Sequence, residues 1–366
     1  MTLPANNNAD RLSAVRRAMT LQDLDYFLVT NPVNIRYLLK RPLLFDSHFS
    51  GALLISNTQA TLFVDARYAE LASGAEIDAG IEFIREPLIE TLTALAEKEK
   101  MRTLGVESRH LRAAAYIKLS EKLGEVVKAN SALVEEVRAV KDSGEIMALT
   151  AAARLGDKIF PRLLERVRPG VTERELALEI EVMFRRDGAS GVSFEPIVAS
   201  GPNSAIPHAG ATDRKLRPGD LLKLDFGCVL NGYCSDMTRT VVLGKPSARQ
   251  KEIYELVRTA QQAALDSLRP GMTGMEADAA AREVFAAAAR AELFIHNLGH
   301  GVGLEVHERP TLGTKSQQKL RSGMVFTIEP GLYESGFGGV RIEDMVVMGE
   351  NGPEILTKAP KEIIVL

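Results

Sequence analysis

Three of the six histidines in this chain lie within one short stretch, which runs from His296 to Glu308 and also contains glycines at 299, 301 and 303. Neutral imidazole is the commonest metal ligand and titrates near neutral pH, so this concentration of histidines indicates a metal site or proton transfer. The glycines disfavour a helix and allow the backbone to approach a ligand closely or to take positive φ. A glycine-rich strand whose histidines face solvent is the alternative interpretation of this stretch alone.

Two aspartates flank a predicted β-hairpin. Strand-like segments lie on both sides of Asn231-Gly232, the strongest short signal for a two-residue hairpin turn. With that turn, Asp225 faces Thr238 and lies diagonally from Asp236. Diagonal neighbours share one face of a strand pair, with Cα atoms about 7–8 Å apart. The spacing therefore predicts that both aspartates point to the same side, close enough to share a cation.

The second part of the chain repeats itself. Residues 168–175 recur as 269–276, and each copy predicts a helix that ends at Gly followed by a helix that starts with a Thr-x-x-Glu capping box. Residues 216–227 recur as 320–331. Two half-domains that face each other across a pseudo-twofold axis would bring matching positions to one cavity. Three matching pairs carry the same chemistry: Asp225 with Glu329, Asp236 with Glu343, and His208 with His307.

These carboxylates need a counter-charge. Asp225 and Glu329 lie among apolar residues, so we expect both strands to be buried on both faces, where an unpaired carboxylate is costly. Lys223 and Arg239 offer one solution, a structural ion network. Four carboxylates with one imidazole instead favour a two-metal site, and a set without thiolates suits Mn²⁺ and admits Co²⁺ or Zn²⁺. The predicted ligands are Asp225, Asp236, His300, Glu329 and Glu343.

A two-metal site of this kind favours hydrolysis. Two neighbouring divalent ions activate water, polarise a carbonyl and stabilise both ends of a displacement. His208 and His307 remain available to donate hydrogen bonds to a developing oxyanion or to protonate a leaving nitrogen.

The chain is long enough for two domains, because a single core rarely grows beyond about 250–300 residues. Alternating strands and helices indicate a small α/β domain over residues 1–135, with Asn31-Pro32 as a turn. Its His48 and His110 are isolated and are expected to be surface or packing histidines. A helix start at Asp142 opens the second domain, residues 136–366. The predicted strands are 26–29, 52–55, 61–64 and 105–107, and the predicted helices are 10–20, 66–73, 88–99 and 111–122.

Composition excludes several classes of protein. A formal net charge of −3 gives no field that would attract nucleic acid or anionic lipid, and neither is expected as a partner. Cys228 and Cys234 are too few for a disulfide framework, and the hairpin register puts them on opposite faces. The first eight residues lack the basic and apolar segments of a secretory signal, and no apolar run approaches the roughly 20 residues of a membrane span. We expect a cytoplasmic protein.

Four segments resemble the pita-bread metallopeptidases, and among them the Xaa-Pro peptidases aminopeptidase P and prolidase. They are Asn-Ser-Ala-Ile-Pro-His at 203–208, Leu-Asp-Phe-Gly at 224–227 with Asp-Met-Thr-Arg-Thr at 236–240, the histidine stretch, and Thr-Ile-Glu-Pro-Gly at 327–331 with Gly-Val-Arg-Ile-Glu-Asp at 339–344. The resemblance covers the whole chain. It implies an α+β fold, in which a pita-bread catalytic domain with an internal pseudo-twofold duplication follows a smaller α/β creatinase-like domain. It also implies a homodimer.

The resemblance further implies roles for the site residues. Asp225 would bind the first metal ion, Asp236 and Glu343 would bridge, and His300 and Glu329 would complete the second, with Glu329 also acting as general base. Further residues match positions that handle protons, contact substrate or lie behind the ligands: His208, His296, His307 and Arg341. Phe194 resembles a wall of the substrate pocket, although ordinary core packing explains it nearly as well.

Two departures from the family pattern bear on the substrate. Asn297 lies between histidines rather than on a ligand and is expected to be tolerated. Many prolidases carry an arginine at the position of Thr311 to bind the free carboxylate of a dipeptide, and threonine cannot replace it; Arg309, Arg36 or Arg41 are possible substitutes. We therefore expect an Xaa-Pro aminopeptidase acting on proline-containing peptides, with an Xaa-Pro dipeptidase as the alternative. A methionine aminopeptidase, a metal-independent creatinase and an inactive peptide-binding relative fit the segments less well.

Overall fold

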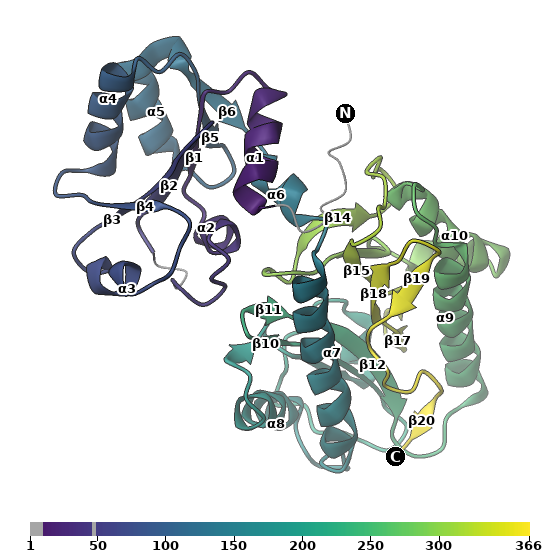
Figure 1. Cartoon of the computed structure of the whole chain (residues 1–366). Coiled ribbons are helices and arrows are strands. Elements are labelled where there is room, and N and C mark those ends of the chain that lie inside the picture. The colour runs from purple at the N-terminus through teal and green to yellow at the C-terminus, as the bar shows by residue number, and fades with distance from the viewer. Residues whose placement is uncertain (1–9, 46–48) are drawn as a thin grey trace. The chain divides into compact units, whose positions relative to one another are not determined.

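A computed structural model describes residues 10–45 and 49–366 of the chain, so the expectations for His48 and for the first eight residues lie outside the described residues. The chain divides into two compact units, Met1–Arg138 and Ala139–Leu366. Each unit has its own sheets and its own core, and Figure 1 labels their elements.

The first unit is built on one six-stranded mixed sheet in the order β4-β3-β2-β1-β5-β6. Strands β1, β5 and β6 are parallel, and β2 runs antiparallel to both β1 and β3. The strands are β1 (Tyr26–Val29), β2 (Ala52–Ser56), β3 (Ala60–Val64), β4 (Gly80–Phe83), β5 (Leu104–Glu107) and β6 (Val127–Asn130). The helices are α1 (Arg11–Thr20), α2 (Pro32–Leu38), α3 (Ala69–Ser73), α4 (Leu88–Glu99), α5 (Ala113–Leu123) and α6 (Leu133–Arg138), with a 3-10 turn η1 (Gly124–Val126).

The α/β prediction for this unit is confirmed, with one interpretation corrected. Asn31-Pro32 does not form an isolated turn: the Asn31 side chain accepts a hydrogen bond from the Val33 amide and caps α2. Proline is favoured at a first helical position because its missing N–H has no intrahelical partner there. Strands β4 and β6 were not predicted. His110 is exposed, as expected for a surface histidine.

The second unit consists of two halves, each with helices and strands. Its helices are α7 (Ser143–Leu164), α8 (Glu173–Arg186), α9 (Ala248–Ser267) and α10 (Gly274–Ala287), with 3-10 turns η2 (Gly201–Ala205) and η3 (Ala291–Leu293). The strands of its first half are β7 (Gly191–Val192), β8 (Ile197–Ser200), β9 (Leu221–Phe226), β10 (Cys228–Leu230), β11 (Tyr233–Cys234) and β12 (Met237–Val242). Those of its second half are β13 (Gly299–Gly301), β14 (Glu308–Leu312), β15 (Val325–Ile328), β16 (Gly331–Glu334), β17 (Gly338–Arg341), β18 (Asp344–Met348), β19 (Pro353–Ile355) and β20 (Ile364–Val365).

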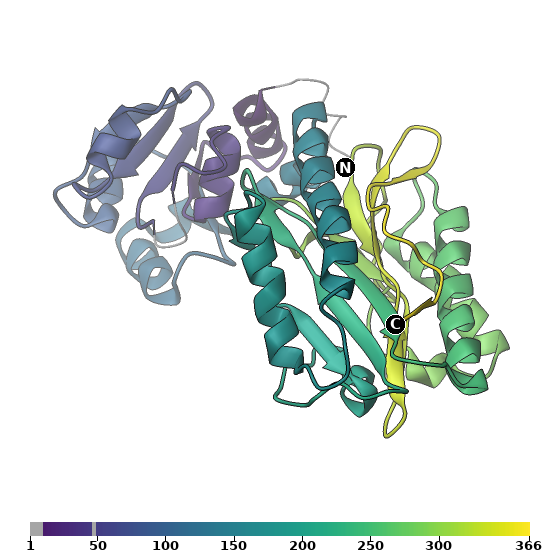
Figure 2. The ribbon, with the colours of Figure 1, turned by 90° about the horizontal axis from the view of Figure 1, so that it is seen from below.

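Each half of the second unit has a sheet covered by a pair of helices. Figure 2 shows α7 and α8 in teal on one side and α9 and α10 in green on the other, with the strands between them. The sheets have the orders β20-β12-β9-β8 and β14-β13-β15-β18-β19. Strand β9 is buried on both faces, as predicted: Leu222, Leu224 and Phe226 enter the core beneath α7 and α8, and the alternate residues face the other half.

The internal duplication is visible in the backbone. The Thr172 and Thr273 hydroxyls each accept a 3.2 Å hydrogen bond from the amide three residues later, and both form complete capping boxes. Gly170 and Gly271 share a φ of 93°. The repeat predicted that each of these glycines ends a helix, and this prediction is wrong. Helices α7 and α9 end at Leu164 and Ser267, and the glycines take the left-handed turn that follows. The predicted pita-bread architecture with its duplication is confirmed.

The predicted hairpin register is also confirmed. Asn231 and Gly232 both have positive φ, at 52° and 83°, as a type I′ turn requires. Asp225 pairs with Thr238 across β9 and β12. At Gly227 the two strands pass so closely that a Cβ atom would lie 1.7 Å from the Ser235 carbonyl oxygen. Both cysteines are free, in agreement with the prediction of no disulfide.

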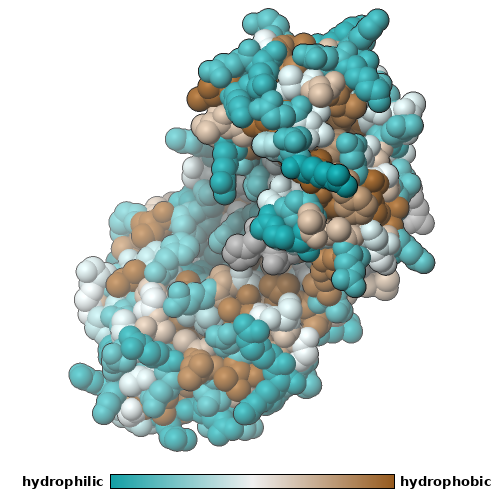
Figure 3. All heavy atoms as spheres, turned by 90° about the vertical axis from the view of Figure 1, so that its left-hand side faces the viewer, coloured by the Kyte–Doolittle hydropathy of each residue, from teal (hydrophilic) through white to brown (hydrophobic). Residues whose placement is uncertain are grey.

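Polar side chains cover much of the visible surface, with smaller hydrophobic patches between them (Figure 3). Across the described residues, no helix combines the length and the apolar character that a membrane span needs. Large hydrophobic side chains that remain exposed occur in both units, and they include Leu43, Phe83, Leu178, Ile206, Ile295 and Val365.

Candidate metal centre

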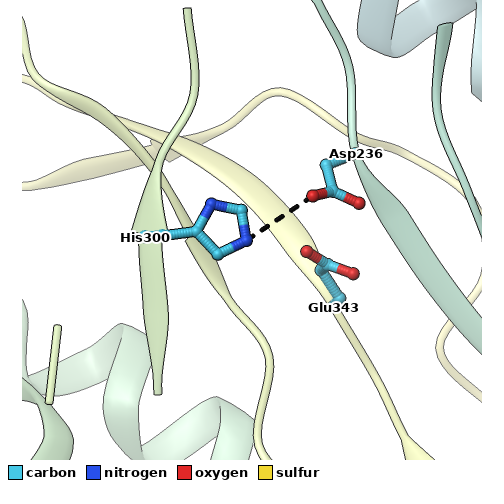
Figure 4. Close-up of side chains that lie close together, drawn as sticks. All are labelled: Asp236, His300 and Glu343. Atoms are coloured by element: carbon cyan, nitrogen blue, oxygen red, sulfur yellow. Dashed lines mark ion pairs between the residues drawn. The ribbon is translucent and has the colours of Figure 1, made fainter. Parts of the chain in front are cut away.

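Five different backbone segments bring the predicted ligands together in the second unit. Asp225 is the last residue but one of β9, Asp236 precedes β12, His300 is the middle residue of β13, Glu329 follows β15, and Glu343 precedes β18. The ligand atoms of Asp236, His300 and Glu343 all lie within 4.8 Å of one another, and Figure 4 shows the three side chains pointing toward a common centre. His300 Nε2 lies 3.2 Å from Glu329 Oε1 and 3.6 Å from Asp236 Oδ2.

Asp225 belongs to the same cluster through its cross-strand partner. Thr238 lies opposite Asp225 in the sheet, and the Thr238 hydroxyl donates a 2.6 Å hydrogen bond to Glu343 Oε2. The Glu343 amide in turn donates to the Thr238 carbonyl at 3.1 Å. Thr238, on a strand of the first half, therefore orients Glu343 of the second half beside Asp225.

The electrostatics of this cluster favour a bound cation. Burial, followed by repulsion from neighbouring carboxylates, raises the pKa of Asp236 and of Glu343 well above their ordinary values. Asp225 Oδ1 and Glu343 Oε1 are buried without a hydrogen-bond partner. A buried acceptor that is left unsatisfied is costly, and a metal ion removes this cost. The oxygen-rich set with one imidazole thus fits divalent metal ions.

His300 is held in the orientation that a metal ligand needs. Its Nδ1 lies 3.2 Å from the Gly301 carbonyl, which only accepts hydrogen bonds, so Nδ1 carries the proton and Nε2 faces the carboxylates. Burial lowers the pKa of His300, but the hydrogen bond with Glu329, the negative charge of Glu329 and the contact with the Gly301 carbonyl together outweigh burial, and the pKa is raised. Burial raises the pKa of Glu329, but the hydrogen bond with His300 and the positive charges of His300 and His296 together outweigh burial, and the pKa falls to about 2.

The glycines around His300 serve close backbone packing. A Cβ atom on Gly299 would lie 2.0 Å from the Thr327 carbonyl oxygen, and one on Gly301 would lie 2.1 Å from that of Arg309. The prediction that the stretch is not helical is confirmed, and the glycines allow neighbouring strands to approach from both sides. The predicted close approach is to protein backbone, and φ is not positive at either position.

The cations near the cluster do not form the ion network considered from the sequence. The Lys223 ammonium donates to main-chain carbonyls, and Arg239 pairs with Asp344 at 2.6 Å. The buried Arg341 is the cation that contacts the ligands: it pairs with Asp225 and donates a 3.0 Å hydrogen bond to the Thr238 hydroxyl. Arg341 therefore lies directly behind the cluster.

The remaining predicted histidines surround this cluster. The His307 ring lies edge-on to His300, with centroids 4.3 Å apart, and burial together with the charge of His300 lowers the pKa of His307. His208 is exposed in the loop after η2. A positive charge on His208 lowers the pKa of His296 and of His307. Phe194 is half-buried in the segment before β8, outside the buried core.

Tyr333 on β16 is a site residue that sequence reasoning missed. Its hydroxyl accepts a 2.8 Å hydrogen bond from Arg341 and lies 2.9 Å from His296 Nε2, so the hydroxyl proton points to His296. Burial raises the pKa of Tyr333 to about 12 and lowers that of His296. The resulting chain of contacts joins Asp225, Arg341, Tyr333 and His296. No sequence motif marks this tyrosine.

Two threonines behind the ligands were also missed, although the strand register contained a signal for them. Thr327 lies two residues before Glu329, donates to it at 3.0 Å and accepts from the His300 amide at 3.1 Å. Thr238 was identified as the partner of Asp225 but was given no role. Alternation along a strand places each threonine on the face of the ligands.

Comparisons with known proteins identify the family. The chain matches metallopeptidase family M24 over residues 147–350 and the creatinase/prolidase N-terminal domain over residues 11–140. It is 35% identical to an Xaa-Pro dipeptidase of Pyrococcus furiosus over 97% of this chain and 99% of that protein. The solved structure of an Xaa-Pro dipeptidase from Bacillus anthracis superposes with a TM-score of 0.92 at 38% identity, covering 97% of this chain and 99% of that chain.

A second solved structure carries a different name. The X-Pro aminopeptidase from Thermotoga maritima superposes with a TM-score of 0.85 at 35% identity, covering 96% of this chain and all of that chain (100%). Family match, identity and fold agree over both units of the chain. The chain therefore belongs to metallopeptidase family M24, with a creatinase/prolidase N-terminal domain, and is a metallopeptidase.

Proposed function

We propose that the protein is a metal-dependent Xaa-Pro peptidase that hydrolyses the bond between an N-terminal residue and a following proline. One observation carries the proposal: four carboxylates and one imidazole from both halves converge, and two buried carboxylate oxygens have no protein partner. Names of relatives support the substrate class, since Xaa-Pro dipeptidases and an X-Pro aminopeptidase are among them.

Two divalent ions, with Mn²⁺ as the preferred metal and Co²⁺ or Zn²⁺ as substitutes, are the proposed cofactors. Such a pair supplies a polarised substrate carbonyl and an activated water molecule at neutral pH. The proposed ligands are Asp225, Asp236, His300, Glu329 and Glu343.

The side chains around the ligands have proposed roles in handling protons and substrate. Glu329 is the proposed general base because its carboxylate lies beside the other ligands, with Oε1 3.2 Å from His300 Nε2, and is ionised at neutral pH. His307 is neutral because its pKa is lowered, so it offers one N–H donor to a developing oxyanion. His208 and His296 are proposed to contact substrate, and Phe194 to line its pocket. Arg341 holds Asp225 in place.

Dipeptides are the proposed substrates. The sequence favoured an aminopeptidase because Thr311 carries no charge, but the relatives named above favour the alternative, a dipeptidase. Thr311 is exposed and lies directly opposite His300 on β14, where it faces the site from a neighbouring strand. Arg309 on the same strand is half-buried and remains the proposed partner of a substrate carboxylate.

A cytoplasmic location and a homodimer are also proposed. The functional division after residue 135, with a creatinase-like domain before it and the catalytic domain at 136–366, stays a prediction. Gel filtration with light scattering on the full chain measures the oligomeric state directly.

The decisive experiment compares Mn²⁺-loaded protein on Ala-Pro and on Ala-Pro-Ala, before and after EDTA treatment. Turnover of Ala-Pro alone supports a dipeptidase, and turnover of Ala-Pro-Ala alone supports an aminopeptidase. Turnover of neither by protein with bound metal would contradict the Xaa-Pro assignment. Activity that survives complete metal removal would contradict the metal-dependent mechanism.

A further inference from the structure

His208 lies on a segment that needs an anchor. The residue follows η2, and neither a helix nor a strand contains it. Its side chain is exposed, yet its proposed task requires the imidazole to stand at a fixed distance from the metal ligands. The position of this imidazole therefore depends on what holds the backbone of residues 204–207.

The side-chain nitrogen of Lys223 holds this backbone through hydrogen bonds to its carbonyl oxygens. Lys223 Nζ donates to the carbonyl oxygens of Ile206 at 2.7 Å, of Pro207 at 3.1 Å and of Ser204 at 3.3 Å. Burial lowers the pKa of Lys223 to about 6, and in either charge state its nitrogen can only donate to carbonyl oxygens, which carry no proton. Lys223 is fully buried, and its Nζ also lies 5.0 Å above the ring of Tyr333. The hydrogen bonds of this side chain go to the segment that leads to His208.

The same strand carries Lys223 and a metal ligand. Lys223 lies two residues before Asp225 on β9, so alternation places both side chains on one face. Arg341, which pairs with Asp225, also donates to the Pro207 carbonyl at 3.2 Å. The backbone next to His208 is thus tied to the element that positions Asp225.

The other half of the duplication uses this position differently. Thr327 occupies the equivalent place on β15, two residues before Glu329, and its hydroxyl makes hydrogen bonds to two nearby site groups, His300 N and Glu329 Oε1. A sheet of this type therefore does not require a lysine here. The long side chain of Lys223 serves its own half, where the histidine segment lies beyond the reach of a threonine.

A second residue, Glu173, anchors the ends of this loop but not the residues that Lys223 contacts. The buried Glu173 carboxylate accepts hydrogen bonds from Ser200 N at 2.7 Å, from Asn203 Nδ2 at 3.1 Å and from Thr212 N at 3.1 Å. These contacts secure the two ends of the loop that carries His208. They do not include Ser204, Ile206 and Pro207, whose carbonyl oxygens accept hydrogen bonds from Lys223.

We propose that Lys223 is a positioning residue for His208, which sets the imidazole against the metal centre through three main-chain carbonyls. The inference rests on the proposed peptidase function. If Lys223 is replaced by methionine, the carbonyls lose a buried donor and the segment shifts. The loss then appears in kcat rather than in metal binding, because the metal ligands keep their own contacts.

The test measures kcat, KM and bound metal for the Mn²⁺-loaded full chain with Ala-Pro as substrate. Four proteins form a double-mutant cycle: wild type, Lys223→Met, His208→Ala and the double variant. We expect Lys223→Met to lower kcat about 10- to 100-fold, as losses of orienting contacts do, with unchanged metal content. In the His208→Ala background the same change should have less than about a twofold further effect, because the group being positioned is absent.

Two further variants separate positioning from loss of stability. Ile180→Ala empties a buried position on α8 and should lower Tm without changing kcat well below Tm. Lys223→Arg keeps a cationic donor and should recover part of the lost kcat; it also serves as the test protein if Lys223→Met does not fold. For Lys223→Arg, the residual loss should again disappear in the His208→Ala background.

Each outcome decides between the alternatives. Equal losses in both backgrounds, or an unchanged kcat in Lys223→Met, would overturn the positioning role while leaving the peptidase function intact. A fully active His208→Ala variant would overturn it as well, because no imidazole would then need positioning. An inert wild-type protein with bound metal would instead overturn the proposed function, and the inference with it.

Discussion

The two halves of the catalytic unit have the same backbone arrangement, but residues at equivalent positions have different roles. At the first residue of α8, the Glu173 carboxylate accepts hydrogen bonds from both ends of the loop that carries His208. At the first residue of α10, Gly274 lets β14 lie directly against the helix, so that a Cβ atom would be 2.2 Å from the Thr311 carbonyl oxygen. Lys223 and Thr327 differ in the same way.

The difference separates what builds this fold from what builds its site. The caps of α8 and α10 and the glycine turns before them are the same in both halves, down to the hydrogen-bond lengths of Thr172 and Thr273. Carboxylates are retained at the matching positions, because a two-metal site needs ligands from both sides. Residues that support the histidine segments differ, because the two segments approach the centre from different loops.

The largest effect is expected where the halves share one function. Asp236→Asn should reduce peptidase activity to background and weaken Mn²⁺ binding, because a neutral amide replaces a charged ligand at the centre of the cluster. Isothermal titration with Mn²⁺ and turnover of Ala-Pro measure both effects. Asp213→Asn, at a mostly exposed aspartate, is the control. Full activity in Asp236→Asn would remove this residue from the metal site.

The same variant should change how the stability of the metal-free protein depends on pH. A carboxyl group whose pKa is raised in the folded state stabilises below its unfolded pKa of about 4, and this contribution is lost as pH rises through the folded value. Metal-free wild type should therefore lose stability as the pH rises above about 4, and Asp236→Asn should lose less. Equal slopes in calorimetry with EDTA would contradict the raised pKa.

Arg239→Met tests the joint between the halves. Arg239 on β12 pairs with Asp344 on β18, and both side chains are only 1% exposed. Without Arg239, Asp344 loses its buried partner but keeps Lys361 at 3.1 Å, so we expect a loss of about 3 kcal/mol in the free energy of unfolding. Arg258→Met, in an exposed pair with Glu255, should cost no more than about 1 kcal/mol. Urea unfolding compares them, and similar losses would contradict the importance of the joint.

Gly274→Ala tests the close approach found in the second half alone. The added methyl group would overlap the Thr311 carbonyl, so the free energy of unfolding should fall by about 1–3 kcal/mol. Gly156→Ala is the matched control, because no neighbouring atom lies within 4 Å of its Cβ position in α7. That change should be neutral or stabilising by up to about 1 kcal/mol. A neutral Gly274→Ala would show that β14 has room to move.

The smallest effect should be the same in both halves. Thr172→Ala and Thr273→Ala each remove a capping hydroxyl with identical geometry, and each should cost about 1 kcal/mol. Urea unfolding of the two variants under one condition measures the difference. Clearly unequal losses in the free energy of unfolding would mean that the two caps do not stabilise their halves equally.

Local signals predicted much of this molecule. The turn at Asn231-Gly232 set the register that brings Asp225 and Asp236 to one face, because alternation along paired strands is a short-range property. Strand β1 and helix α4 have the predicted bounds, since apolar periodicity marks both. Helix α2 was mistaken for a turn, because Asn-Pro is a frequent signal for turns and for helix starts alike.

The amino-acid sequence alone determined the duplication, the strand register and the matching of the carboxylates, because each depends on spacing along the chain. Only the tertiary structure decided which cation meets which partner. Arg341 pairs with Asp225 and Tyr333, while Lys223 holds the carbonyls before His208. These contacts join residues far apart in the sequence, and their geometry depends on how two sheets and several loops pack. No local pattern contains that information.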